Sequence, residues 1–164
     1  MGAREFPGSG VTHPVVLAAI VLLALNDHLL KRAYPGVVTG KLSDAAGLCF
    51  FPVFLEALFE LVSSRWRRPF EPRWTHAVGS VLLTLIGFAL AKSTELGADA
   101  YRVALGVLQW PFGALRAVLA GREVPGLWRV AFTRDPSDLW VLPCVLVPLW
   151  LAKRRVERAR AQPL

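Results

Sequence analysis

The sequence has few of the residue types on which common catalytic and metal sites depend. Its 164 residues include 2 cysteines and 3 histidines, and Cys49 and Cys144 both lie inside apolar runs. It contains no C-x-x-C pair, zinc-ligand spacing, G-x-S-x-G, H-E-x-x-H, phosphate-binding loop or dinucleotide-binding motif. The enzyme and zinc-protein classes that carry these motifs are excluded, and the sequence contains no motif for an organic cofactor.

Charged residues are also scarce, and they are unevenly placed. They make up 19% of the chain and hydrophobic residues 54%, against about 25% and about 45–50% in ordinary soluble domains. The net charge of +7 comes largely from basic residues beside apolar runs, at 65–73 and 153–160. Membrane proteins mark their cytoplasmic side in this way. We therefore expect a membrane protein with a lipid bilayer around it and no nucleic-acid partner.

Four apolar runs predict four membrane spans in an all-α chain. We expect the spans near residues 13–30, 45–64, 76–93 and 138–153, with an uncleaved first span and a basic tail at 153–164. Because a span needs about 20 residues of helix, the polar ends of three runs must dip into the membrane. The prediction is a single transmembrane domain over residues 1–164, an integral membrane four-helix bundle.

The segment 97–121 does not fit a fifth span. Glu95, Arg102, Gln109 and Arg116 recur every seven residues along an otherwise apolar stretch. This spacing places them on one narrow stripe of a helix. We expect an additional amphipathic helix, interfacial or re-entrant, that does not cross the membrane and whose stripe faces water or headgroups.

The basic clusters also predict the orientation. Dense basic charge next to a span favours the cytoplasm, which places the 65–73 loop and both termini there. The 31–43 loop and the 93–137 segment then lie outside. An Arg-, Ala-, Gly-, Pro- and Leu-rich composition is compatible with a GC-rich bacterial genome, so the expected location is the bacterial inner membrane.

Polar residues from all four predicted spans meet at the outer face. Ionisable groups at membrane depth are costly and by default mark a functional site. Asp44 and Asp138 are the candidate catalytic residues, either as bases or as ligands of a divalent cation such as Mg²⁺ or Ca²⁺. The candidate binding residues are Asn26, Asp27, His28, Lys31, Lys41, Ser43, Lys92 and Asp135. The competing interpretation is that Ser43, Asp44 and Asp135 simply cap helices.

Sequence spacing gives this site a geometry that a structure can check. Cys49 lies five residues after Asp44, and Cys144 lies six after Asp138. The second and fourth spans both enter from outside, so the two thiols should lie at nearly equal depth. If the spans are neighbours, Asp44 and Asp138 approach to roughly 10 Å or less. Because two carboxylates this close repel, either one of them would bind a proton or both would need Lys41, Lys92 or a metal.

Two acids lie inside the second predicted span. Glu56 and Glu60 are one helical turn apart in a stripe of small and polar residues, which is typical of contact with protein rather than lipid. We expect Glu60 to reach the basic loop and pair with Arg65 or Arg67. For Glu56, a hydrogen bond to a neighbouring helix and a role in carrying protons or a cation both remain open.

One stretch of the chain resembles a known pattern. It resembles the motif TGKLSD-x2-GL…P of small uncharacterised bacterial multi-pass membrane proteins. The residues that carry the resemblance are Asn26-Asp27, Lys31, Pro35, the run Thr39–Leu48 and Pro52. Asp135 and Asp138-Leu139 resemble its second element. The resemblance implies that the outer polar cluster is a site, and it implies no particular activity.

Three functions follow from these patterns. The first is binding or modification of an anionic lipid headgroup or envelope precursor, with Lys41 and helix N-termini holding phosphate. The second is transport of an ion, proton or small solute with Glu56 on the path. The third is a non-catalytic assembly partner of a membrane complex, formed with a membrane protein or with further copies of the chain. The sequence does not decide whether the chain is an enzyme.

Overall fold

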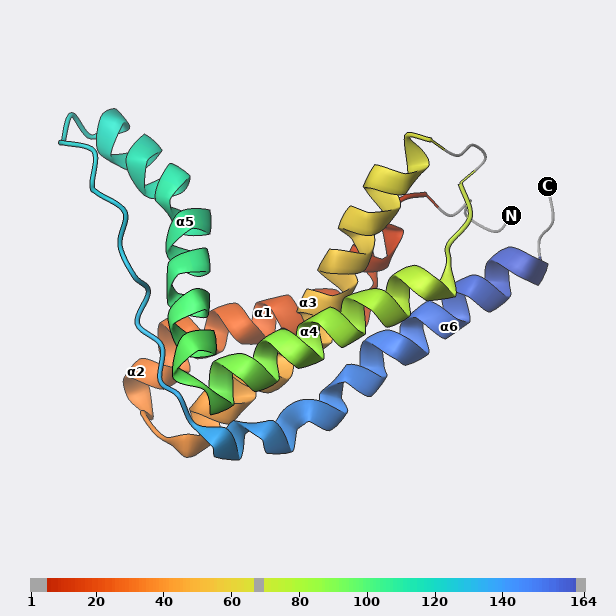
Figure 1. The fold of residues 1–164 in the computed structure, drawn as a ribbon, viewed down its shortest axis with the longest axis horizontal. Helices are drawn as coiled ribbons and strands as arrows, with labels where there is room; N and C mark the ends of the chain where they lie inside the picture. The colour runs from red at the N-terminus through yellow and green to blue at the C-terminus, as the bar shows by residue number, and fades with distance from the viewer. Residues whose placement is uncertain (1–5, 67–69, 162–164) are drawn as a thin grey trace. The chain divides into compact units, whose positions relative to one another are not determined.

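The computed structural model describes residues 6–66 and 70–161, and every regular element in these two ranges is helical (Figure 1). This confirms the all-α prediction for the described residues. The elements in chain order are η1 Ser9–Thr12, α1 Pro14–Leu25, η2 Asn26–Leu30, α2 Lys31–Ala33, α3 Val37–Ser64, α4 Trp74–Ser93, α5 Glu95–Leu119, η3 Pro136–Val145 and α6 Leu146–Ala161.

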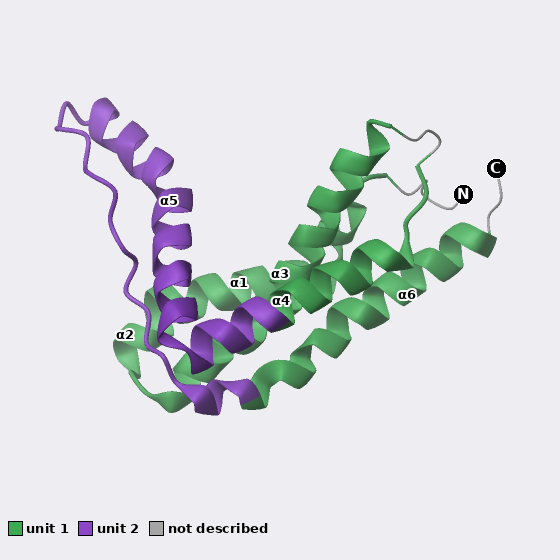
Figure 2. Cartoon of the chain, viewed as in Figure 1, with its two compact units in different colours: residues 1–85, 140–164 green, residues 86–139 purple. Residues whose placement is uncertain are grey.

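The chain divides into two compact units, coloured separately in Figure 2. The first comprises residues 1–85 and 140–164, and the second comprises residues 86–139. The second unit is therefore an excursion between two parts of the first. Each unit is described by itself.

Three helical stretches in the described residues are long and apolar enough to cross a membrane. They are Pro14–Ala33, Val37–Ser64 and Trp74–Ser93, and they correspond to the first three predicted spans. The predicted fourth span is not one continuous α-helix, because η3 is a 3₁₀-helix that contains Pro143 and the α-helix resumes only at Leu146. Proline has no N–H to donate and its ring clashes with the preceding turn. The four-helix bundle stays a prediction.

The first unit is built around the packing of α1 against α3. Proline at the first helical position starts α1, and His13 caps it, its Nδ1 accepting from the Val15 N–H at 3.3 Å. The buried core joins Val16 of α1, Val53 of α3 and Leu151 of α6. Three elements far apart in the sequence thus share one apolar contact.

α3 runs parallel to the segment formed by η3 and α6. The Cys49 Sγ lies 3.7 Å from the carbonyl oxygen of Cys144, and an Arg155 Nη lies 3.3 Å from Glu60 Oε2. Both pairs are separated by 95 positions in the sequence, so the two segments keep one register along their shared length. The two cysteines are neighbours, and the expectation that their thiols lie at equal depth in a membrane stays a prediction.

The second unit consists mainly of α5 and an extended segment, 122–135, that returns along it. Thr94 caps α5, its Oγ1 accepting from the Gly97 N–H at 3.0 Å, which confirms the predicted helix over 97–121. The Val130 N–H donates to the Arg102 carbonyl at 3.2 Å, and the Trp110 indole N–H donates to the Pro125 carbonyl at 2.8 Å. The extended segment is therefore fastened along the helix.

Glycine allows this close approach. A Cβ at Gly106 would lie 1.9 Å from the Trp128 carbonyl oxygen, and one at Gly113 would lie 2.6 Å from the Trp128 ring. Arg102, expected to face water or headgroups, instead binds Asp99 at 2.7 Å and the Phe132 carbonyl at 3.0 Å. Arg102 is thus half-buried beside the extended segment, whereas Gln109 and Arg116 of the same stripe are exposed. That α5 does not cross a membrane stays a prediction.

Candidate functional site

The residues of the predicted outer site are shared between the two units. Asn26, Asp27, His28, Lys31, Lys41, Ser43 and Asp44 belong to the first unit, and Lys92, Asp135 and Asp138 to the second. The separation of Asp44 and Asp138 therefore stays a prediction. Within each unit, the structure shows which of these side chains come together.

In the first unit, Asn26 joins the end of the first span to α3. Asn26 is completely buried, and its Nδ2 donates to the Thr39 carbonyl and to Ser43 Oγ, each at 2.6 Å. Ser43 Oγ in turn donates to Asp27 Oδ1 at 2.5 Å, and Lys31 Nζ lies 2.7 Å from the same oxygen. We call these five residues the Asn26 cluster. Its hydrogen bonds hold the two helices together where the chain turns between them.

Local helix geometry explains why this cluster forms. Asn26–Leu30 is a turn of π-helix, in which the wider turn changes the direction of successive side chains, and such turns often occur at functional sites. Thr39 and Ser43 are about one helical turn apart on α3, so one amide group reaches both the Thr39 carbonyl and the Ser43 hydroxyl. The π-helical turn and the first two turns of α3 therefore meet at Asn26.

The interpretation of Ser43 and Asp44 as helix caps is wrong. α3 begins at Val37, so both residues lie inside the helix rather than at its start. Thr39 instead occupies the first turn, its hydroxyl donating to the carbonyls of Tyr34 and Gly36 at 3.1 and 3.0 Å. The sequence misplaced the start because the polar run 39–44 resembles a loop.

The other predicted binding residues of this unit lie around the cluster. His28 is exposed. Lys41 and Asp44 are half-buried on α3, and both interact with other groups. Their predicted roles in binding phosphate or a divalent cation stay predictions.

In the second unit, Lys92 and Asp138 form a buried ion pair. Lys92 Nζ lies 2.7 Å from Asp138 Oδ2, and the two side chains are only 6% and 9% exposed. The ammonium also lies over the Phe88 and Phe132 rings, at 5.5 and 5.0 Å from their centroids, a favourable placement for a cation. Of the three neutralising groups expected beside Asp138, the structure places Lys92 there.

Further contacts near the Lys92–Asp138 pair join the two ends of the second unit, residues 86–139. Asp135 Oδ1 accepts from the Ser137 N–H at 2.9 Å, which confirms that Asp135 caps the start of η3. Arg134 pairs with Glu95 at 2.8 Å and donates to the Ser93 carbonyl at 3.4 Å. The Lys92–Asp138 pair thus joins the end of α4 to the start of η3, and the Arg134–Glu95 pair joins the start of α5 to the residues just before η3.

No group of three or more His, Cys, Asp or Glu residues among those described is arranged to hold a metal ion. Asp138, one of the two predicted ligands, already has the Lys92 ammonium against its carboxylate. The proposed Asp44–Asp138 site for Mg²⁺ or Ca²⁺ therefore stays a prediction, and no step of the proposed function depends on it.

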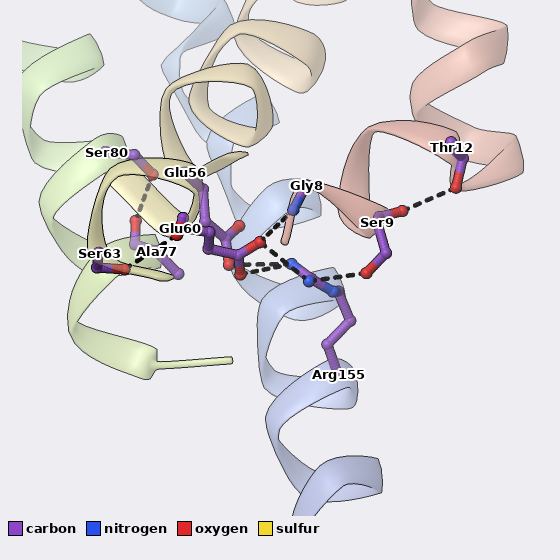
Figure 3. A network of polar contacts seen from close by, with 9 residues as sticks. All are labelled: Gly8, Ser9, Thr12, Glu56, Glu60, Ser63, Ala77, Ser80 and Arg155. Atoms are coloured by element: carbon purple, nitrogen blue, oxygen red, sulfur yellow. Dashed lines mark hydrogen bonds and ion pairs between the residues drawn. The ribbon is translucent and has the colours of Figure 1, made fainter. Parts of the chain in front are cut away.

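A third group of polar residues, the Arg155 cluster, was not predicted as a unit. Figure 3 shows Arg155 of α6 pointing between Glu56 and Glu60 of α3, beside Gly8 and Ser9. One Nη lies 3.3 Å from Glu56 Oε1 and 3.2 Å from Glu60 Oε1. The other donates to Ser9 Oγ at 3.0 Å and to Glu60 Oε2 at 3.3 Å. The Gly8 N–H donates to Glu60 Oε2 at 2.8 Å, so one guanidinium ties the N-terminal turn to α3 and α6.

This cluster corrects two expectations. Glu60 pairs with Arg155 rather than with Arg65, which is exposed, and Arg67 lies outside the described residues. Arg155 is not a solvated residue of a basic tail, because it is only 7% exposed and α6 continues to Ala161. The Glu60–Arg155 pair follows from one signal in the sequence. The register that pairs Cys49 with Cys144 also pairs Glu60 with Arg155, because both pairs are 95 positions apart.

Replacing Arg155 should destabilise the protein strongly. In Arg155→Met, two buried carboxylates lose the guanidinium that lies between them, and breaking a buried ion pair from one side costs about 3–5 kcal/mol. We expect a clear fall in Tm and in the amount of protein in membranes. Arg158→Met removes an exposed charge from the same helix and should change the unfolding free energy by less than about 0.5 kcal/mol. Equal Tm values for the two variants would contradict a structural role for the cluster.

Comparison with known proteins adds no family to these observations. No family model matches the sequence, and no curated protein or solved structure is similar to it. The resemblance to small bacterial multi-pass membrane proteins stays a prediction. Function is therefore inferred from the residues and contacts of this chain.

Proposed function

We propose that the chain is a multi-pass protein of the bacterial inner membrane that acts as a non-catalytic partner in a membrane complex. Its polar residues hold its own helices together, and its apolar surface is available to lipid and to a partner protein. The observation that carries the proposal is that the buried acids Glu56, Glu60 and Asp138 are each held by a cation of the same chain.

The surface of the three candidate spans supports a membrane location. Large apolar side chains are exposed on all of them, including Val21 at 57%, Val62 at 65% and Leu82 at 52%. Soluble monomers rarely expose apolar patches of this extent. Small and polar residues face the helix contacts instead, as in membrane bundles, where packing and hydrogen bonds rather than hydrophobicity drive association.

The Arg155 cluster supports the proposed orientation. It brings the residues before α1 together with the ends of α3 and α6, so both terminal segments lie at one end of the first unit. The ends of α3 and α6 that meet at the Arg155 cluster also carry exposed basic residues, namely Arg65, Lys153, Arg154 and Arg158. A concentration of basic residues beside spans favours the cytoplasm, which places both termini there.

The ion pairs favour a structural over a chemical role. A catalytic acid or base must reach its substrate, but Asp138 is buried against Lys92. A proton path through Glu56 needs a carboxylate that exchanges protons, and Arg155 occupies that carboxylate. These pairs serve more naturally to fix helices against one another.

α5 provides a surface for the partner. Gly106 and Gly113 mark the face that the extended segment covers, whereas large apolar residues elsewhere on the helix are exposed. They include Leu108 at 63%, Phe112 at 73% and Leu119 at 80%. An amphipathic helix of this kind binds at a lipid interface or against an apolar helix of another protein.

The topology has a direct test. With Cys49 and Cys144 replaced by serine, Tyr34→Cys should react with a membrane-impermeant maleimide in intact spheroplasts, because it lies between the first two spans on the outer side. Ala161→Cys should react only after permeabilisation. Labelling of Ala161→Cys in intact spheroplasts would disprove the proposed orientation.

The non-catalytic role has a second test in the Lys92–Asp138 pair. Lys92→Met and Asp138→Leu alone should each lower stability by about 3–5 kcal/mol, because one buried charge is left unpaired, whereas the double variant should recover most of the loss. The double variant should also keep the native complex size in mild detergent.

A matched control is the more exposed pair Arg134–Glu95, in which the side chains are 38% and 71% exposed. Arg134→Met with Glu95→Leu should change stability by about 1 kcal/mol or less. If Lys92→Met with Asp138→Leu is as stable as the wild type but loses the complex, the pair takes part in binding, and the structural role is refuted.

A further inference from the structure

A cavity of about 540 Å³, open to solvent, lies at the start of α4 in the first unit, and its charged lining residues are exposed. Arg73, Trp74 and Thr75 line one side of it, and Val156, Ala159 and Arg160 of α6 line the other. Its volume is in the range of small-molecule sites. None of the residues of the predicted outer site contributes to it.

The charge of this cavity suits an anion. Arg73 and Arg160 both line it, and within the described ranges neither forms an ion pair with a carboxylate. The 20-residue helix α4 begins at Trp74, so its positive dipole end and its first N–H groups, which have no acceptor inside the helix, lie at the same place. Arginine fits phosphate well, because its planar group can donate two parallel hydrogen bonds.

The remaining lining suits a lipid rather than a small free ion. Trp74, Val156 and Ala159 supply apolar surface next to the two arginines, and tryptophan is enriched where a membrane meets water. Glu71 also lines the cavity. Two guanidinium groups and one carboxylate leave a single positive charge in excess, which matches the single negative charge of a phosphodiester better than a doubly charged free phosphate.

We propose that this cavity binds the phosphate of an anionic phospholipid in the cytoplasmic leaflet. The assignment rests on the membrane location and orientation proposed above. Basic pockets between helices on the cytoplasmic side are suited to such headgroups. Arg73 and Arg160 contact the phosphate, and Trp74 with Val156 packs against the glycerol and the adjoining acyl chain.

The test compares lipid binding to the full chain by native mass spectrometry in detergent. The probes are phosphatidylglycerol, phosphatidylcholine and inorganic phosphate. The pocket variant is Arg73→Gln with Arg160→Gln. The control variant, Arg65→Gln with Arg158→Gln, removes the same charge from arginines at the same end of the unit that are also exposed but do not line the cavity.

We expect the wild type to bind phosphatidylglycerol more tightly than phosphatidylcholine. A basic residue near an anionic headgroup contributes about 1 kcal/mol, so the pocket variant should lose about tenfold or more in affinity and the control variant less than about threefold. Equal losses in the two variants would overturn the site. Displacement of the lipid by inorganic phosphate at comparable concentration would overturn the assignment to a lipid.

Failure of this proposal can be told apart from failure of the membrane proposal. Extraction of wild-type membranes with alkaline carbonate tests insertion without reference to the cavity. A protein that is retained in the membrane but binds both lipids equally refutes the headgroup site alone. A protein released by carbonate refutes the membrane location, and with it the assignment to a lipid of the cytoplasmic leaflet.

Discussion

The arrangement of the first unit depends on one buried guanidinium. Arg155 lies within 3.3 Å of carboxylate oxygens of both Glu56 and Glu60, and it also reaches the hydroxyl of Ser9. Charges are costly to bury, and the cost is recovered only when the geometry is good and the remaining donors and acceptors are satisfied. The planar fork of arginine meets this condition, because its donors reach several oxygens at once. Three segments that are distant in the sequence are therefore fixed at one end of the unit.

The other polar groups repeat the same use of hydrogen bonds and ion pairs at different places. The Asn26 amide joins the first span to α3 at the opposite end from Arg155, and the Lys92–Asp138 pair closes the second unit where the excursion begins and ends. In lipid, apolar side chains gain little by leaving one apolar surrounding for another, so helix contacts rely on packing and polar bonds. The large apolar residues that are exposed on α1, α3 and α4 would suit such a surrounding.

The sequence predicted the helices better than it predicted their contacts. Long apolar runs identified the three helical stretches that are long and apolar enough to cross a membrane, and the seven-residue polar spacing identified α5, because helix period and composition are local properties. The start of α3 was missed because the polar residues 39–44 resemble a loop, and the break near Pro143 was missed because an apolar run does not show where a helix changes type. Arg155 was placed in a solvated tail because it stands in a basic run. Its burial depends on the register between α3 and α6, which only the folded chain displays. The cap at Asp135, by contrast, was predicted from the local sequence alone.

The central claim is that Arg155 holds the N-terminal turn, α3 and α6 together, and hydrogen exchange tests it most directly. Exchange of backbone amides should be compared between the wild type and Arg155→Met in the same detergent. The account predicts faster exchange over residues 8–12 and over the last turns of α3 in the variant. Exchange over residues 26–43, which the Asn26 cluster holds separately, should stay unchanged. Unchanged exchange at residues 8–12, or a uniform increase over both regions, would contradict it.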